Sequence, residues 1–148
     1  CYILLGWNMA GYSENDFKAD AKAFINLLLA HNSAIKITLV GIQIPSLDGL
    51  GDNYGASGTY SKFRALQEYV FNVDKWNLDI AAEYSGNVST ISISGQFDTE
   101  NNMPTTDALV NIRSTKTFAM QNNGIHPATE GYYQIADAVY RKFTADNA

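Results

Sequence analysis

Two short segments contain the residue types that acyl-transfer chemistry needs. Gly6-Trp7-Asn8 directly follows an apolar run, and His126 lies within residues 123–127, just before a helical pattern. The Asn8 carboxamide could donate a hydrogen bond to a developing oxyanion. An imidazole changes its charge near neutral pH, so His126 could take a proton from a hydroxyl nucleophile and return it to a leaving group. Pro127 fixes φ and lacks a backbone donor, which keeps His126 in a loop.

Each of these residues also has a plainer interpretation. Asn8 taken alone is more readily a turn-former at the end of a strand. His126 could cap a helix or lie on the surface. His31 ends a helical pattern, where a cationic side chain suits the helix dipole, and we assign it no role.

The elements that would position these residues alternate between strand and helix. Apolar runs predict strands, and apolar residues at helical spacing predict amphipathic helices. This order indicates an α/β fold with a parallel sheet and helices on both faces, whose functional residues gather at the carboxyl ends of the strands. The expected elements are strands over 2–6, 35–44 and 88–93, and helices over 13–31, 66–84 and 129–143.

Two long polar segments separate these elements. Residues 47–59 are rich in Gly, Asp, Asn and Ser, and Tyr54 in this loop could form a lip over a sugar ring. A surface loop without that role explains the composition equally well. Residues 96–124 are too long for a plain connection, so we expect them to carry binding residues or a short helix. Trp7 would line the same cleft as Asn8 or pack beneath it.

Composition limits the remaining classes of function. The chain has 148 residues, 46% of them hydrophobic, and a net charge of −5, so nucleic acid and anionic membranes are disfavoured as partners. One Cys and two His form no metal-ligand pattern, and we expect neither metal nor cofactor. Three strands are few for an open sheet. We therefore expect residues 1–148 to be the C-terminal part of a single larger domain whose N-terminal segment supplies further strands.

The ordered pair of motifs resembles the SGNH or GDSL-type hydrolases. Gly6-Trp7-Asn8 is similar to the block that carries the oxyanion-hole Asn, and His126 is similar to the catalytic His. The resemblance implies a flavodoxin-like, three-layer fold and hydrolysis of short acyl esters, commonly of carbohydrate, through a Ser nucleophile. Residues 110–114 and 121–127 are similar to members from phages and prophages, which leaves the compartment open between secreted and virion-associated.

The sequence departs from this family's pattern at two places. The Gly-Asp-Ser block of the nucleophile is absent, and Ser57 and Ser94 look like ordinary loop residues, so the nucleophile is expected upstream. Asn123 stands where the family usually has Asp. Its carbonyl could accept a hydrogen bond from the imidazole, but it would not stabilise an imidazolium as a carboxylate does. Asp98, after the third strand, is the alternative residue to orient the ring.

Two other functions remain open at this point. The chain could be a non-catalytic module, binding carbohydrate or building a phage tail, that keeps the fold without activity. A nucleotide-binding domain is disfavoured, because no glycine-rich phosphate loop opens a helix after a strand. Gly49-Leu50-Gly51 is a weak match to such a loop.

Overall fold

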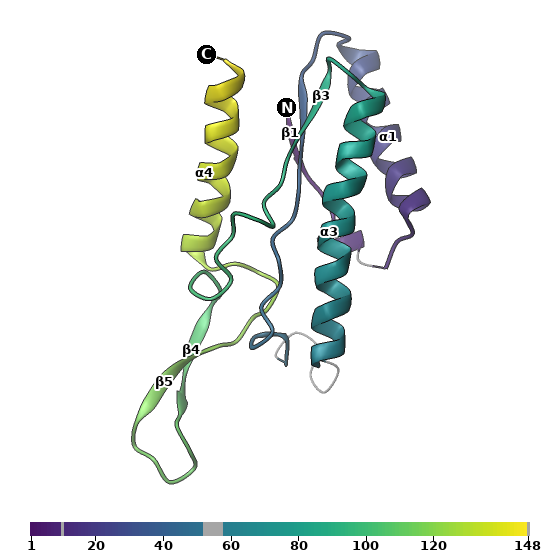
Figure 1. Cartoon of the computed structure of the whole chain (residues 1–148). Helices are drawn as coiled ribbons and strands as arrows, with labels where there is room; N and C mark the ends of the chain where they lie inside the picture. Colours follow the sequence, from purple (N-terminus) through teal and green to yellow (C-terminus); the bar gives the residue numbers. More distant parts are fainter. Residues whose placement is uncertain (10, 52–57, 148) are drawn as a thin grey trace. The chain divides into compact units, whose positions relative to one another are not determined.

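The structure, a computed structural model, describes residues 1–9, 11–51 and 58–147. Backbone contacts divide the chain into two compact units. We call Cys1–Gln43, Glu68–Gln96 and Ala138–Ala148 the sheet unit, and Ile44–Gln67 and Phe97–Asp137 the hairpin unit. The elements in chain order are β1 (Tyr2–Leu4), the short 3-10 helix η1 (Trp7–Met9), α1 (Glu14–His31), β2 (Ile37–Val40), α3 (Tyr60–Glu83), β3 (Val88–Ile91), β4 (Thr105–Leu109), β5 (Thr117–Gln121) and α4 (Thr129–Asp146) (Figure 1).

The sheet unit contains a parallel sheet of three strands in the order β1-β2-β3. Thr38 of β2 pairs with Tyr2 on one side and with Ser89 on the other. All four residues of β2 are buried, as expected for a central strand covered on both faces. The alternation of strand and helix therefore predicts the α/β class and the parallel pairing correctly. The predicted strand over 35–44 is too long, because the chain leaves the ladder after Val40.

Helix α1 begins where the sequence predicts. The Ser13 hydroxyl accepts a hydrogen bond from the Asp16 backbone N–H at 3.2 Å, which satisfies one of the open donors of the first turn. Phe17 and Ile25 form the buried stripe of the helix. The Phe17 ring lies 5.3 Å from that of Trp76, centroid to centroid, so aromatic packing joins α1 to α3.

An ion-pair cluster also joins these two helices. Lys18 of α1 lies 2.6 Å from the Glu14 carboxylate and 2.7 Å from that of Asp79 on α3. Hydrogen bonding from Lys18 lowers the pKa of Asp79 and that of Glu14. The same carboxylates raise the pKa of Lys18, Asp79 contributing most. The charged form of each group is thus favoured in the folded state.

The hairpin unit contains β4 and β5, which pair antiparallel with Asp107 opposite Ala119. Figure 1 shows them as a two-stranded hairpin. Of the two alternatives predicted for residues 96–124, the short helix is not formed, and the binding residues stay a prediction. A turn closes the hairpin, where the Asn111 side chain accepts from the Arg113 backbone N–H at 3.0 Å. Both strands are mostly exposed, so they lack the apolar alternation that would have revealed them in the sequence.

The last two helices are longer than their apolar patterns. α3 begins at Tyr60, well before Leu66, and the Thr59 hydroxyl accepts from the Lys62 backbone N–H at 3.4 Å. α4 continues past Phe143 to Asp146. The added residues, 60–65 and 144–146, mix polar and apolar side chains and do not continue the apolar periodicity of either helix. In the part of the chain that the structure describes, no helix has both the length and the apolar character needed to span a membrane.

Candidate functional site

His126 lies on a short loop, residues 122–128, which we call the His loop. Backbone hydrogen bonds hold it along its length: Asn122 N–H donates to Pro104 O at 3.0 Å, and Ala128 N–H donates to Asn102 O at 2.9 Å. Between them, Gly124 O accepts from the Ser46 N–H at 2.8 Å. His126 itself is exposed. The loop therefore presents an accessible imidazole from a fixed backbone at the start of α4.

Glycines allow the His loop to touch the chain that follows β2. A Cβ on Gly124 would lie 2.6 Å from Ser46 O and 2.7 Å from Leu50 N, and a Cβ on Gly49 would lie 2.5 Å from the Asn123 carbonyl carbon. Real side chains do not approach backbone so closely, so both positions need glycine for lack of space. Gly49 thus has a packing role, which the weak Gly49-Leu50-Gly51 motif did not indicate.

The Asn123 side chain contacts His126, but not in the way the sequence suggested. Its Oδ1 accepts from the backbone N–H groups of Ile125 at 3.0 Å and of His126 at 2.8 Å. Its Nδ2 lies 3.1 Å from His126 Nδ1. The predicted hydrogen bond from the imidazole to the amide carbonyl is therefore wrong, because the carbonyl oxygen faces two backbone donors and the NH₂ group faces the ring.

Asp98, the alternative residue to orient His126, forms hydrogen bonds within its own turn. Its Oδ1 accepts from the backbone N–H groups of Glu100 at 3.0 Å and of Asn101 at 3.1 Å, and its Oδ2 accepts from the Asn101 side chain at 2.9 Å. These bonds, the Asn101 side chain foremost, lower the pKa of the Asp98 carboxyl. The structure gives this carboxylate a local turn-forming role instead of one at the imidazole.

Gly6-Trp7-Asn8 turns the chain at the carboxyl end of β1. Gly6 has φ of +145°, and a Cβ there would lie 3.1 Å from the Ile42 side chain. Its carbonyl accepts from Met9 N–H at 2.8 Å and from the Tyr69 hydroxyl at 3.0 Å. Burial raises the pKa of Tyr69 to about 12. Gly6 is therefore a structural requirement of this turn, and Tyr69 fixes its position.

Asn8 and Trp7 follow within η1. Asn8 is exposed, and the described residues offer its carboxamide no hydrogen bond, so its NH₂ group is available to a ligand. The Trp7 indole Nε1 is buried and has no hydrogen-bond partner in the described part of the chain. A buried indole N–H normally has a partner. Trp7 is half-buried as a whole, and among the described residues its indole N–H has no acceptor.

The expected site residues fall into two groups. Gly6, Trp7 and Asn8 belong to the sheet unit, and Asn123 and His126 belong to the hairpin unit. The structure shows a side-chain contact between Asn123 and His126, whereas Gly6, Trp7 and Asn8 are neighbours along the chain. An approach of Asn8 to His126 in one cleft stays a prediction. Tyr54 and Ser57, the expected substrate contact and the serine discounted as nucleophile, lie outside the described residues.

A polar cluster that the sequence did not reveal lies after β3. The hydroxyls of Ser92 and Ser94 each donate to Asp74 Oδ2 at 2.6 Å. Ser94 lies in a turn after β3, in agreement with its expected place in a loop, and its side chain is buried. Gly41 leaves room for the Asp74 carboxylate, which a Cβ would meet. The Ser-x-Ser spacing was the available signal. The cluster joins α3 to the end of β3.

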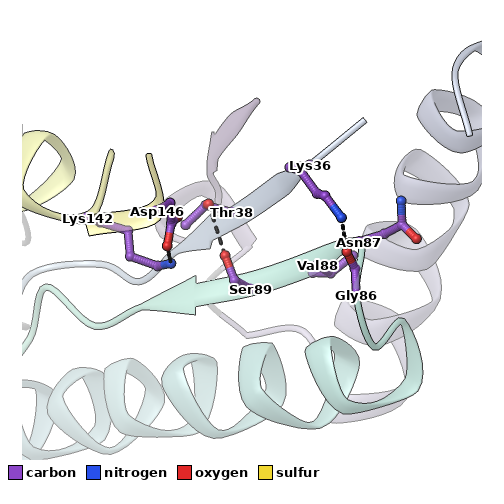
Figure 2. A pocket seen from close by; sticks show the side chains of 8 residues that line it. All are labelled: Lys36, Thr38, Gly86, Asn87, Val88, Ser89, Lys142 and Asp146. Atoms are coloured by element: carbon purple, nitrogen blue, oxygen red, sulfur yellow. Dashed lines mark hydrogen bonds and ion pairs between the residues drawn. The ribbon is translucent and has the colours of Figure 1, made fainter. Parts of the chain in front are cut away.

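A hollow of about 310 Å³ opens at the amino-terminal ends of β2 and β3. Figure 2 shows the two Lys of its lining turned to neighbouring oxygens: Lys36 donates to Gly86 O, and Lys142 pairs with Asp146. Function in parallel sheets gathers at the opposite, carboxyl ends. We therefore do not assign this hollow to the site. The described residues hold no group of three or more His, Cys, Asp or Glu placed to bind a metal ion.

A larger hollow, of about 650 Å³, lies in the hairpin unit. Gln121, which lines it, precedes the His loop and donates to Thr99 O at 2.8 Å and to Glu100 O at 2.7 Å. Phe118 and Met120 provide apolar surface beside polar groups. The lining thus combines apolar surface with hydrogen-bonding groups. The lining consists of Asp48, Glu100, Asn101, Thr105, Phe118, Ala119, Met120 and Gln121.

Comparison with known proteins shows likeness at the level of the fold. No family model matches the chain, and no curated protein does. A solved structure, a salicylyl-acyltransferase from a tetracycline biosynthetic pathway, is similar over 99% of this chain with a TM-score of 0.53 and 16% sequence identity. The chain spans 37% of the length of that protein. What is shared is an α/β architecture with a parallel sheet.

Proposed function

We propose that this chain is the C-terminal portion of a serine ester hydrolase of the SGNH or GDSL type that acts on short acyl esters of carbohydrate. His126 is its proton-transfer residue, and Asn8 donates to the oxyanion. Gly6, Trp7 and Tyr54 contribute to the binding of substrate. The observation that carries the proposal is the His loop, because it holds an exposed imidazole on backbone that is hydrogen-bonded at both ends.

The turn after β1 supports the role of Asn8. It lies at the carboxyl end of a parallel strand, where ligands bind in open α/β sheets. Its carboxamide is exposed, and its backbone is fixed through Gly6 and Tyr69. A donor that is already in place contributes more to an oxyanion than one that must be ordered during the reaction.

The free edge of β1 supports a nucleophile from outside residues 1–148. Among the described strands β1 pairs with β2 alone, and its Tyr2 and Leu4 are exposed. An unpaired edge with apolar side chains is a place for another strand. The family likeness places the nucleophilic Ser after such an upstream strand. The acyltransferase of similar fold is also much longer than this chain.

The reaction would proceed by acyl transfer in two steps. The Ser hydroxyl gives its proton to His126 as its oxygen attacks the ester carbonyl, and Asn8 donates to the resulting oxyanion. Collapse of the tetrahedral intermediate breaks the bond to the alcohol, which leaves with the proton from His126. Water then repeats the sequence on the acyl-enzyme, releasing the acid and restoring the Ser hydroxyl.

Hydrolysis of p-nitrophenyl acetate by the full-length protein tests the proposal. His126→Ala should abolish turnover, while His31→Ala, which changes the other imidazole, should leave it intact. Asn8→Ala should lower kcat by about 10²–10³-fold, the usual effect of losing one oxyanion donor. Full activity in His126→Ala would contradict the role of this residue.

A non-catalytic carbohydrate-binding or structural module is the second candidate. The amide at position 123 favours it, since a hydrolase of this type usually has a carboxylate there. An NMR titration with an acetylated oligosaccharide distinguishes the two functions. Shifts around the His loop without any turnover by the full-length protein support the module, whereas turnover that depends on His126 supports the enzyme.

A further inference from the structure

The backbone fixes the orientation of the Asn123 carboxamide. Its Oδ1 faces the N–H groups of Ile125 and His126, at 3.0 and 2.8 Å. Backbone N–H groups only donate, so the opposite orientation would place the NH₂ group against two donors and leave both unsatisfied. The NH₂ group must therefore be the part that lies 3.1 Å from His126 Nδ1.

An NH₂ group determines what the facing ring nitrogen can be. It has no lone pair to offer, so Nδ1 can form this hydrogen bond only by accepting. In a neutral imidazole one nitrogen carries the proton and the other accepts, and Nδ1 as acceptor leaves the proton on Nε2. We propose that Asn123 is a positioning residue that holds His126 in the Nε2–H tautomer, so that in the resting site the ring donates at Nε2 instead of accepting.

The consequence for catalysis rests on the proposed function. A base at Nε2 needs the proton on Nδ1, which a carboxylate at position 123 would favour by accepting it. With Asn123 in place, the proton must first leave Nε2 for solvent and another must bind Nδ1, at the cost of the amide contact. Until then Nε2–H is a donor, suited to holding a carbonyl or an anionic oxygen. The chain would accordingly be a slow hydrolase.

NMR of the full-length protein labelled with ¹⁵N tests the tautomer directly. Long-range ¹H–¹⁵N correlations, recorded where imidazole is neutral, distinguish a nitrogen that carries a proton from one that does not. His126 should carry its proton on Nε2. His31 provides an internal reference, because its ring has no hydrogen bond among the described residues. A proton on Nδ1 of His126, or the same tautomer average at both residues, would overturn the proposal.

Asn123→Asp is the matched substitution. One carboxylate oxygen can still accept from the two backbone N–H groups, so the loop keeps its hydrogen bonds, while the other oxygen replaces the NH₂ group that faces Nδ1. The tautomer of His126 should then reverse. Asn122→Asp adds the same charge one residue away and should leave the tautomer unchanged. An unchanged tautomer in Asn123→Asp, or a reversal in both variants, would contradict the proposed contact.

Activity provides a separate measurement. If the full-length protein hydrolyses p-nitrophenyl acetate, Asn123→Asp should raise kcat by about 10-fold or more, up to the 10²–10⁴-fold that general-base catalysis typically contributes. An unchanged or lower kcat in an active protein would overturn the catalytic consequence. The Nε2–H tautomer in a protein that no variant makes active refutes the proposed hydrolase and supports the tautomer. A proton on Nδ1 in an active protein refutes the tautomer and supports the hydrolase.

Discussion

Gly124→Ala should destabilise the protein because the added methyl group has no space. A Cβ there would meet Ser46 O, Leu50 N and the Gly49 carbonyl carbon at 2.6, 2.7 and 2.9 Å. These are backbone atoms, which cannot move aside as the tip of a side chain can. Overpacking of this kind costs about 1–3 kcal/mol. The backbone of Gly124 adds no further strain, because its φ is not positive.

Gly95→Ala is the matched control for this substitution. Gly95 also lacks a positive φ, and nothing lies within 4 Å of its hypothetical Cβ. Replacing Gly by Ala at such a site stabilises proteins by about 0.4–1 kcal/mol through the unfolded chain. That contribution applies to both variants, so their difference measures the contact alone and should be about 1–3 kcal/mol.

Urea denaturation followed by circular dichroism measures both variants. The midpoint should fall in Gly124→Ala and stay equal or rise in Gly95→Ala, with similar slopes if the unfolded states match. Equal stability of the two variants would refute the close approach of the His loop to residues 46–50. Long-range ¹H–¹⁵N correlations of His126 should also change in Gly124→Ala alone, because this loop carries the ring.

Three further substitutions test the packing and the electrostatics. Ile80→Ala should lower the free energy of unfolding by about 2–5 kcal/mol, because Ile80 is fully buried. Leu78 is exposed, so Leu78→Ala should change the free energy of unfolding by less than about 0.5 kcal/mol. Equal effects of the two substitutions in urea denaturation would contradict the described core. Asp74→Ala should cost about 1–3 kcal/mol by removing the carboxylate that accepts from both Ser92 and Ser94, and Asp74→Asn, which keeps an acceptor oxygen, should cost less by the same assay. Lys18→Met should lower the urea midpoint at neutral pH. Ion pairing lowers the pKa of Asp79 and of Glu14, so the pairs stabilise the fold above the ordinary carboxyl pKa, and this stability is lost as the pH falls toward the lowered pKa values. The difference in urea midpoint between Lys18→Met and the unsubstituted protein should therefore vanish in acid. A difference that persists in acid would contradict the ion pairs.

The sequence predicts the sheet unit better than the hairpin unit for a physical reason. Strand β2 is buried on both faces and helix α1 on one face, so each has a pattern of apolar residues that can be recognised in the sequence. β4 and β5 bury almost nothing, and their pairing depends on backbone hydrogen bonds that leave no such pattern. The length of residues 96–124 predicts only that the segment carries binding residues or a short helix, and it contains no signal for a hairpin.

The candidate site could likewise be predicted from the sequence only in part. The residue types in Gly6-Trp7-Asn8 and in the His loop were visible in the sequence, and so was the proximity of Asn123 to His126 through their short spacing. The direction of the Asn123 amide was not, since it depends on which of two groups the backbone N–H donors face. The sequence also does not predict the roles of Gly49, Asp74 and Ser94, because each depends on a partner distant in the sequence.

The hydroxyl of Tyr69 makes the turn that carries Asn8 observable by ultraviolet absorbance. A tyrosinate cannot donate to Gly6 O, so ionisation removes that hydrogen bond. Because the folded pKa is about 12 against an ordinary 10.0, the neutral ring stabilises the fold below about pH 10, and this stability is lost as the pH rises toward the folded value. An alkaline titration should therefore show a tyrosine that becomes tyrosinate only near pH 12, and loss of this late absorbance in a variant would report, optically and without any substrate, that Tyr69 behind the Gly6 turn has become exposed.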